Sequence, residues 1–177
     1  MKNTVFIIII YSVSLYSCSP SRDKMSGEIF KMESEIKTAQ KIDSVAFMGL
    51  LSAYQNFSSK YPGDSMTPGF LFKAAGIAAG LDRGTQAIGL YKSVIDTYPD
   101  YRKIPECYFM EAFTYENTLG NNVKANVLYH EFLVRYPDHD LTDDALAAIK
   151  FPGKSPEEML REFEKMRSDS VKEVTDK

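Results

Sequence analysis

The sequence AIGLYKSVIDTYP, residues 87–99, carries the pattern that sets the fold class of this 177-residue chain. Its apolar residues follow the spacing i, i+4, i+7 and i+11, which places them on one stripe of an α-helix: Ala87, Tyr91, Val94 and Tyr98. Pro99 ends that helix, because proline lacks the N–H of the helical ladder and moves the preceding residue out of helical conformation. The segment therefore predicts an amphipathic helix with a defined stop.

The same pattern occurs twice more in the chain. Residues 50–62 read LLSAYQNFSSKYP, and residues 125–137 read ANVLYHEFLVRYP. The three prolines, Pro62, Pro99 and Pro137, recur at nearly equal intervals. Self-similarity at a fixed period of about 20–50 residues is the signature of a repeat architecture. The chain is therefore predicted to stack copies of one helical unit.

A partner helix precedes each of the last two stripes. Thr67-Pro68 offers an N-cap followed by proline at the first helical position, and an apolar run continues to Leu81. Pro105 likewise opens a run that extends to Leu119. Short turns rich in Gly, Asp and Asn separate each run from the stripe that follows. The predicted unit is an antiparallel helical hairpin closed by a Tyr-Pro turn.

These units resemble tetratricopeptide repeats. The signature positions of the middle unit hold Leu71, Ala74, Ala75, Ala78, Ala87, Tyr91, Val94 and Pro99, and those of the next hold Phe109, Ala112, Phe113, Glu116, Ala125, Tyr129, Phe132 and Pro137. Glu116 departs from the pattern, which has an aromatic residue there. The resemblance implies an all-α fold, a right-handed superhelix of about four helix pairs. It also implies a non-catalytic scaffold that binds protein partners.

Residues 1–17 are predicted to be a lipoprotein signal peptide. Lys2 precedes an apolar stretch over residues 5–13, the layout of a secretory signal that is too short to span a membrane. Residues 15–18, LYSC, resemble the bacterial lipobox, which implies lipid attachment at Cys18 and a membrane anchor. An ordinary signal with an incidental Cys18 is the alternative. By family sorting rules, a Cys-Ser start implies an outer-membrane protein that faces the periplasm.

The remaining boundaries follow from composition and periodicity. Residues 18–26 are expected to form a flexible tether, and residues 27–167 the repeat domain, with units 68–99 and 105–137 matching best. Within the domain, helical spacing predicts an opening helix over residues 27–40 and a short helix over 143–150. A capping box before an apolar face predicts a capping helix over 156–167. Residues 168–177 are polar and aperiodic, so a frayed tail is expected.

Composition and motifs argue against catalysis, cofactors and nucleic acid. The net charge is −3 and the chain shows no clustered basic run, as phosphate binding would need. No HExxH motif, cysteine pair or phosphate loop occurs. His139 and the acidic residues around it lack the order of a calcium loop, so a solvated turn with Asp140 or Thr142 capping the next helix is expected. Cys107 is expected to be a buried structural thiol.

The candidate partner-binding strip lies on the first helices of two units. It consists of Phe72, Gly76, Ala79, Gly80, Met110, Thr114 and Asn117, which the repeat pattern would place along the concave groove. This neutral strip suits a peptide or helix of an envelope protein, although helices of the same chain are an equal alternative as its cover. Lengthened repeats resemble the lipoprotein subunit of the outer-membrane barrel-assembly machine and the periplasmic repeat protein of the Tol-Pal system. The expected role is outer-membrane protein assembly or envelope maintenance.

A second hypothesis is a module that binds glycan or peptidoglycan. It rests on three tyrosines whose rings could stack on sugars: Tyr101, Tyr108 and Tyr115. Core or turn packing is the competing interpretation of the same three residues.

Overall fold

The structure is a computed structural model that describes residues 21–40, 43–154, 158, 161 and 165. Across these residues the chain forms α-helices and no strand. In chain order the helices are α1 Arg22–Thr38, α2 Ser44–Lys60, α3 Thr67–Gly80, α4 Gly84–Thr97, α5 Ile104–Asn117, α6 Asn122–Arg135 and α7 Thr142–Lys150. None of the helices in this described part is both long and apolar enough to cross a bilayer.

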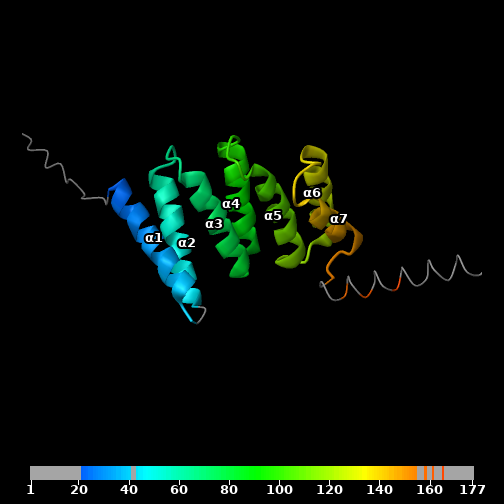
Figure 1. Cartoon of the computed structure of the whole chain (residues 1–177), viewed down its shortest axis with the longest axis horizontal. Coiled ribbons are helices and arrows are strands. Elements are labelled where there is room, and N and C mark those ends of the chain that lie inside the picture. The colour runs from blue at the N-terminus through cyan, green and yellow to red at the C-terminus, as the bar shows by residue number, and fades with distance from the viewer. Residues whose placement is uncertain (1–20, 41–42, 155–157, 159–160, 162–164, 166–177) are drawn as a thin grey trace, which may run out of the picture.

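The helices stand side by side in a row that follows the order of the chain (Figure 1). Each helix packs against its neighbours in sequence, so α1 with α2, α3 with α4 and α5 with α6 form three hairpins. Helix α7 packs against α6, in the place where the first helix of another hairpin would lie. The predicted all-α superhelix of tetratricopeptide-like hairpins is confirmed.

The repeated stripe forms the core. The tyrosine at the same place in each stripe is buried, with 1–2% of its surface exposed: Tyr54, Tyr91 and Tyr129. Both helices of the middle hairpin carry fully buried alanines, among them Ala78 on α3 and Ala87 on α4. Burial of one large apolar side chain contributes about 1.5–3 kcal/mol, so the sum over the repeats is the main stabilising term. The pattern that predicts the helices thus also fixes which face of each helix is buried.

The Tyr-Pro connections share one backbone geometry. The tyrosine that ends each second helix has nearly the same dihedral angles, with φ of −127°, −128° and −136° at Tyr61, Tyr98 and Tyr136. The N–H of each tyrosine donates to the carbonyl four residues earlier, at 2.8–2.9 Å. In addition, the Tyr98 hydroxyl donates to the Pro62 carbonyl at 2.8 Å, which joins two successive connections. The Tyr-Pro stops therefore share a backbone geometry as well as a regular spacing in the sequence.

A fourth stop of the same kind ends α7, and the sequence analysis does not predict it. Phe151 has φ −129° and ψ 58°, and its N–H donates to the Ala147 carbonyl at 2.9 Å. The signal in the sequence is the dipeptide Phe151-Pro152, which repeats the aromatic-proline order. Phe151 follows Tyr136 after less than half of the interval that separates Tyr98 from Tyr136. A search for helix stops at the repeat interval therefore misses it.

The predicted threonine caps are wrong. Thr67 is the first residue of α3 and not its N-cap, which is Met66. The Thr67 hydroxyl instead donates to the Tyr61 carbonyl at 2.6 Å. At α7 the N-cap is Leu141, and neither expected residue caps the helix with its side chain; Thr142 donates to the Tyr136 carbonyl at 3.4 Å. The tight connection brings that carbonyl within reach of a hydroxyl one residue inside the helix.

Helix α1 begins at Arg22, so residues 22–26 belong to the helix and not to a flexible tether. The Ser21 side chain accepts from the Lys24 N–H at 3.4 Å, which caps the helix. Two guanidinium nitrogens of Arg22 donate to the Asp64 carboxylate at 2.8 and 3.2 Å, which anchors the start of α1 to the connection between α2 and α3. This tertiary contact explains the earlier start.

Several predictions lie outside the described residues. These are the signal peptide over residues 1–17, the lipid site Cys18, the tail over 168–177 and most of the capping helix over 156–167.

Candidate partner-binding grooves

The groove between α1, α2 and α3 is the first candidate site, and we call it the N-terminal groove. Its volume is about 640 Å³. Apolar side chains from all three helices line it: Ile36, Phe47, Leu50, Ile77 and Leu81. The other lining residues are Glu33, Lys37, Ser44, Tyr54, Lys73, Gly76 and Gly80. Two residues of the predicted strip, Gly76 and Gly80, thus lie in an apolar groove with charged groups in its wall.

Two of the three charged residues that line this groove, Glu33 and Lys73, pair with each other. The Tyr54 hydroxyl donates to Glu33, and the Lys73 ammonium lies 2.8 Å from Glu33 Oε1. Burial and the neighbouring Glu33 carboxylate raise the pKa of Tyr54 far above its ordinary value, so the phenol stays protonated and remains a donor. These contacts join α1, α2 and α3 through one carboxylate.

The two glycines of the groove are not required by the packing of the chain. A Cβ at Gly76 would lie 3.8 Å from the Tyr91 hydroxyl, an ordinary contact, and a Cβ at Gly80 would meet nothing within 4 Å. Neither residue has a positive φ. Glycine inside a helix costs about 0.8–1.0 kcal/mol relative to alanine, so each position gives up stability. What the missing side chains provide is free space in the groove.

The rest of the predicted strip does not form one continuous surface. Phe72 packs edge-on against Tyr91, with ring centroids 5.8 Å apart, while Ala79 and Met110 are half-buried. The placement of Thr114 on a partner-binding surface is wrong, because its side chain is fully buried and its hydroxyl donates to the Met110 carbonyl at 2.7 Å. A threonine can bond to its own helix in this way, which removes the need for water. Asn117 lies in a different groove.

That second groove lies between α5, α6 and α7 and has a volume of about 770 Å³; we call it the C-terminal groove. Its walls include Phe109 and Phe113 as well as Asn117. The Tyr129 hydroxyl donates to Glu116 Oε2 at 2.9 Å, and the Gly153 N–H donates to Glu116 Oε1 at 2.9 Å. The acidic residue that departs from the repeat signature thus joins α5 to α6 and to the segment after α7.

His139 and Cys107, which were considered for metal and thiol chemistry, take part in packing. Within the described ranges, no three or more His, Cys, Asp or Glu side chains gather to hold a metal ion. His139 accepts from the Leu141 N–H at 3.2 Å and packs edge-on against Phe132. Cys107 is fully buried, and burial raises the pKa of its thiol to about 12. The expectation of a buried thiol is confirmed.

The three tyrosines of the glycan hypothesis are half-buried. The Tyr108 ring packs against Tyr136, with centroids 5.7 Å apart, and against the Arg135 guanidinium at 5.1 Å. Tyr101 packs against the main core, and Tyr115 against the cluster formed by α5, α6 and α7. Their rings therefore stabilise the protein interior, as the packing interpretation expects.

Comparison with known proteins supports the repeat. The tetratricopeptide-repeat family model matches residues 106–139, which cover most of α5, all of α6 and the Tyr-Pro turn after it. This part of the chain is similar to a tetratricopeptide repeat. The other two hairpins share its order of elements and its Tyr-Pro stop. No curated protein matches the chain. Repeats of this family are typically scaffolds that bind protein partners.

Proposed function

We propose that this protein is a non-catalytic scaffold whose N-terminal groove holds a segment of a partner protein. One observation carries the proposal: the groove is apolar, and two exposed glycines on α3 keep it free of side chains although the packing of the chain does not require them. Concave surfaces of stacked hairpins suit extended peptides and helices, because they offer contacts from several helices at once.

The experiment fills the groove and leaves the fold intact. Gly80→Leu places a leucine side chain in the N-terminal groove, where its Cβ meets nothing within 4 Å. Gly89→Leu is the matched control, because Gly89 is an exposed glycine of α4 with equally open space around its Cβ and does not line this groove. Both substitutions raise helix propensity, so neither should destabilise the chain.

Quantitative capture from detergent-solubilised cell envelopes would decide the proposal. Wild type and Gly89→Leu should enrich the same partner, whereas Gly80→Leu should lose it. Equal capture by all three proteins would show that the groove is not the binding surface. Capture of no specific partner by wild type would contradict the scaffold function itself.

The proposed place of action is the outer membrane, on its periplasmic side, in protein assembly or envelope maintenance. Support comes from the sequence, in which residues 15–18, LYSC, resemble the bacterial lipobox that ends in the lipid-carrying cysteine. A single acyl chain gives weak binding, and several chains on one cysteine give a stable anchor. Cys18→Ala in the full chain should therefore move the protein into the soluble fraction, while Cys107→Ala should leave it with the membranes. Membrane retention of Cys18→Ala would refute the anchor.

A further inference from the structure

The outer face of α6 carries an exposed, mostly apolar stripe, which we call the valine face. It consists of four residues with the spacing i, i+4, i+7 and i+11: Val123, Val127, His130 and Val134. The three valines are 81%, 55% and 82% exposed, and His130 is exposed as well. Single exposed apolar residues are ordinary on protein surfaces, but a stripe that follows one helix indicates a contact surface.

The other repeats show that the architecture does not need this stripe. The equivalent positions lie two residues before each core position of the second helix. On α4 all four are exposed, and only the first is β-branched: Thr85, Gly89, Lys92 and Asp96. On α2 none is β-branched: Met48, Ser52, Gln55 and Ser59. Valine is a poor helix former, because its branched side chain loses rotamer freedom in a helix. The exposed valines of α6 therefore cost helix stability and contribute little to the core.

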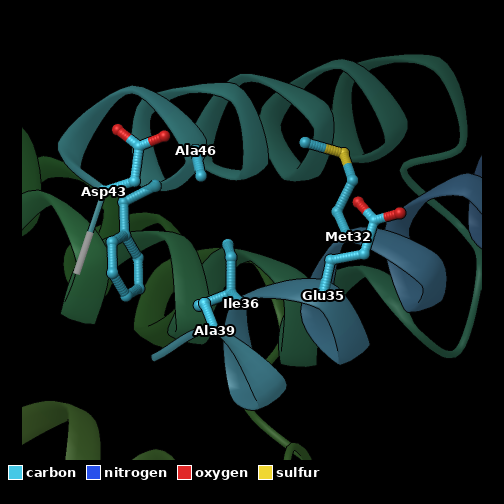
Figure 2. A pocket seen from close by; sticks show the side chains of 7 residues that line it. Met32, Glu35, Ile36, Ala39, Asp43 and Ala46 are labelled. Carbon is cyan, nitrogen blue, oxygen red and sulfur yellow. The ribbon is translucent and has the colours of Figure 1, made fainter. Parts of the chain in front are cut away.

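At the other end of the row, apolar residues of α1 are directed into the fold. Figure 2 shows Met32 and Ile36 pointing from α1 toward α2, and both are only partly exposed. A Cβ at Gly49 of α2 would lie 3.3 Å from the Met32 side chain, so Met32 contacts α2 closely. These apolar residues thus serve internal packing, whereas the valine face points away from the core of its own chain.

Charged residues border the valine face on one side. Lys124 and Glu131 each follow a member of the stripe by one residue, so both lie on the same flank of α6, two turns apart. Glu131 lies 2.9 Å from Arg135, but such exposed pairs contribute little. The Arg135 guanidinium also packs on the ring of Tyr108 at 5.1 Å, which directs it toward α5. Lys124 and Glu131 are therefore the charges that an approaching helix would meet first.

We propose that the valine face binds the same face of a second copy of the chain, with the two α6 helices antiparallel about a two-fold axis. The alternating steps of four and three residues are those of a coiled-coil seam. Antiparallel pairing places Val123 of each copy against Val134 of the other, so apolar residues meet apolar residues. It also places Lys124 of each copy within one turn of Glu131 of the other, which gives two opposite-charge contacts.

Parallel pairing lacks this charge match. It would bring the flank of Lys124 and Glu131 against the opposite flank of the second helix, which carries Asn126 and Leu133. The charges on the page therefore favour the antiparallel pair.

The size of the contact predicts weak, reversible pairing. Each copy contributes one face of a 14-residue helix. Such a contact belongs to the class below about 1,200 Å² of total buried area, which is typical of transient association. Helix α6 and the helices of the N-terminal groove lie toward opposite ends of the row, so pairing leaves both grooves free (Figure 1). The pair is thus a bivalent scaffold, which raises the apparent affinity for a partner with two binding segments.

Sedimentation equilibrium of the full chain in a mild, density-matched detergent measures the pairing. Wild type should show a reversible monomer–dimer equilibrium between about 10 μM and 1 mM. The double variant Val123→Gln and Val134→Gln should stay monomeric over this range, because the pair loses four valines. The matched control is Ser59→Gln with Thr85→Gln, which changes the corresponding exposed positions of α2 and α4 and should pair as wild type does. Glutamine is at least as good a helix former as the residues it replaces, so both variants should keep the fold.

Charge reversal tests the antiparallel arrangement. Lys124→Glu alone, or Glu131→Lys alone, replaces two attractive contacts by two repulsive ones, so each variant should pair about tenfold more weakly than wild type. An equimolar mixture of the two variants restores opposite charges at both contacts of the mixed pair. Association of the mixture should therefore return to near the wild-type level, and added salt should reduce these differences.

Four results would overturn the proposal. The first is a wild type that stays monomeric at every concentration. The second is pairing that the valine variant keeps, or that the control variant loses to the same degree. The third is a mixture of charge variants that pairs no better than either one alone. The fourth is a monomeric wild type whose capture of an envelope protein is lost only in the valine variant, because a different protein would then occupy the face. Gly80→Leu should pair as wild type does, so the groove function and the pairing can fail separately.

Discussion

Replacing Thr67 by valine tests the side-chain hydrogen bond in the connection between the first and second hairpins. The Thr67 side chain is fully buried, and its hydroxyl donates to the Tyr61 carbonyl at 2.6 Å. Valine has the same shape and the same β-branching, so helix propensity and volume are nearly unchanged. Only the hydrogen bond is lost. Because that carbonyl still accepts from the Asp64 N–H at 3.1 Å, it is not left fully unpaired.

The expected loss of stability is about 1 kcal/mol, the usual net contribution of one internal hydrogen bond, and not the larger penalty of an orphaned buried group. With an m-value of about 1–3 kcal/mol per molar urea, the unfolding midpoint should fall by about 0.3–1 M. Urea unfolding followed by circular dichroism at the helical band measures this shift.

Thr142→Val is the internal control, because it occupies the same place in the third connection. Its hydroxyl lies 3.4 Å from the Tyr136 carbonyl and 3.2 Å from that of Pro137, and the side chain is partly exposed. Longer and solvated bonds contribute less, so the midpoint should move by less than half as much. An equal shift for both variants, or none for Thr67→Val, would refute the view that the buried threonine holds the connection.

Two further predictions concern titratable groups. The Arg22 guanidinium lowers the pKa of Asp64, so this carboxylate stabilises the fold above its ordinary pKa of about 4 and the contribution is lost as pH falls through the lowered value. Asp64→Asn should therefore be less stable than wild type at pH 7, and acid-unfolding curves should show this difference in stability disappearing below pH 4. A difference in stability that does not change with pH would contradict the prediction. In a Cys18→Ala background the buried Cys107 should react with a thiol reagent at pH 8 only after unfolding in urea, and rapid labelling of the native protein would be the opposite result.

The helices and their buried faces could be predicted because the information for them is local. A stripe at i, i+4, i+7 and i+11 followed by proline determines one helix, its end and its apolar face within a single short segment. Three copies at nearly one period then determine the architecture, because each hairpin can bury its stripe only against the next. The stop at Phe151 shows the limit of this reasoning, since a search that relies on the period misses the same local signal when it falls outside that period.

The grooves could be predicted only in part. Gly76 and Gly80 stand out in the sequence because glycine inside a helix has a cost, and both line the N-terminal groove. The burial of Thr114 could not be predicted in the same way, because its spacing does not reveal which side of α5 the neighbouring helices cover. Asn117 is on the same helix and yet faces the C-terminal groove.

The carboxylates that shape the grooves could not be predicted at all. Glu33 accepts from Tyr54 and pairs with Lys73, partners 21 and 40 residues away in the chain. Glu116 receives the N–H of Gly153 from 37 residues away. Such separations carry no periodic signal, because each contact depends on how helices pack against one another within a hairpin or between hairpins.

Local sequence is enough to specify a stack of helical hairpins with Tyr-Pro stops and a buried tyrosine stripe, since each of these features follows from residues within one turn or one hairpin of each other. The places where the stack is open depend instead on tertiary packing. The angle between α1 and α2 and the distance of α1 from α3 create the N-terminal groove. This angle and this distance depend on packing among three helices at once, so the sequence of no single helix determines them.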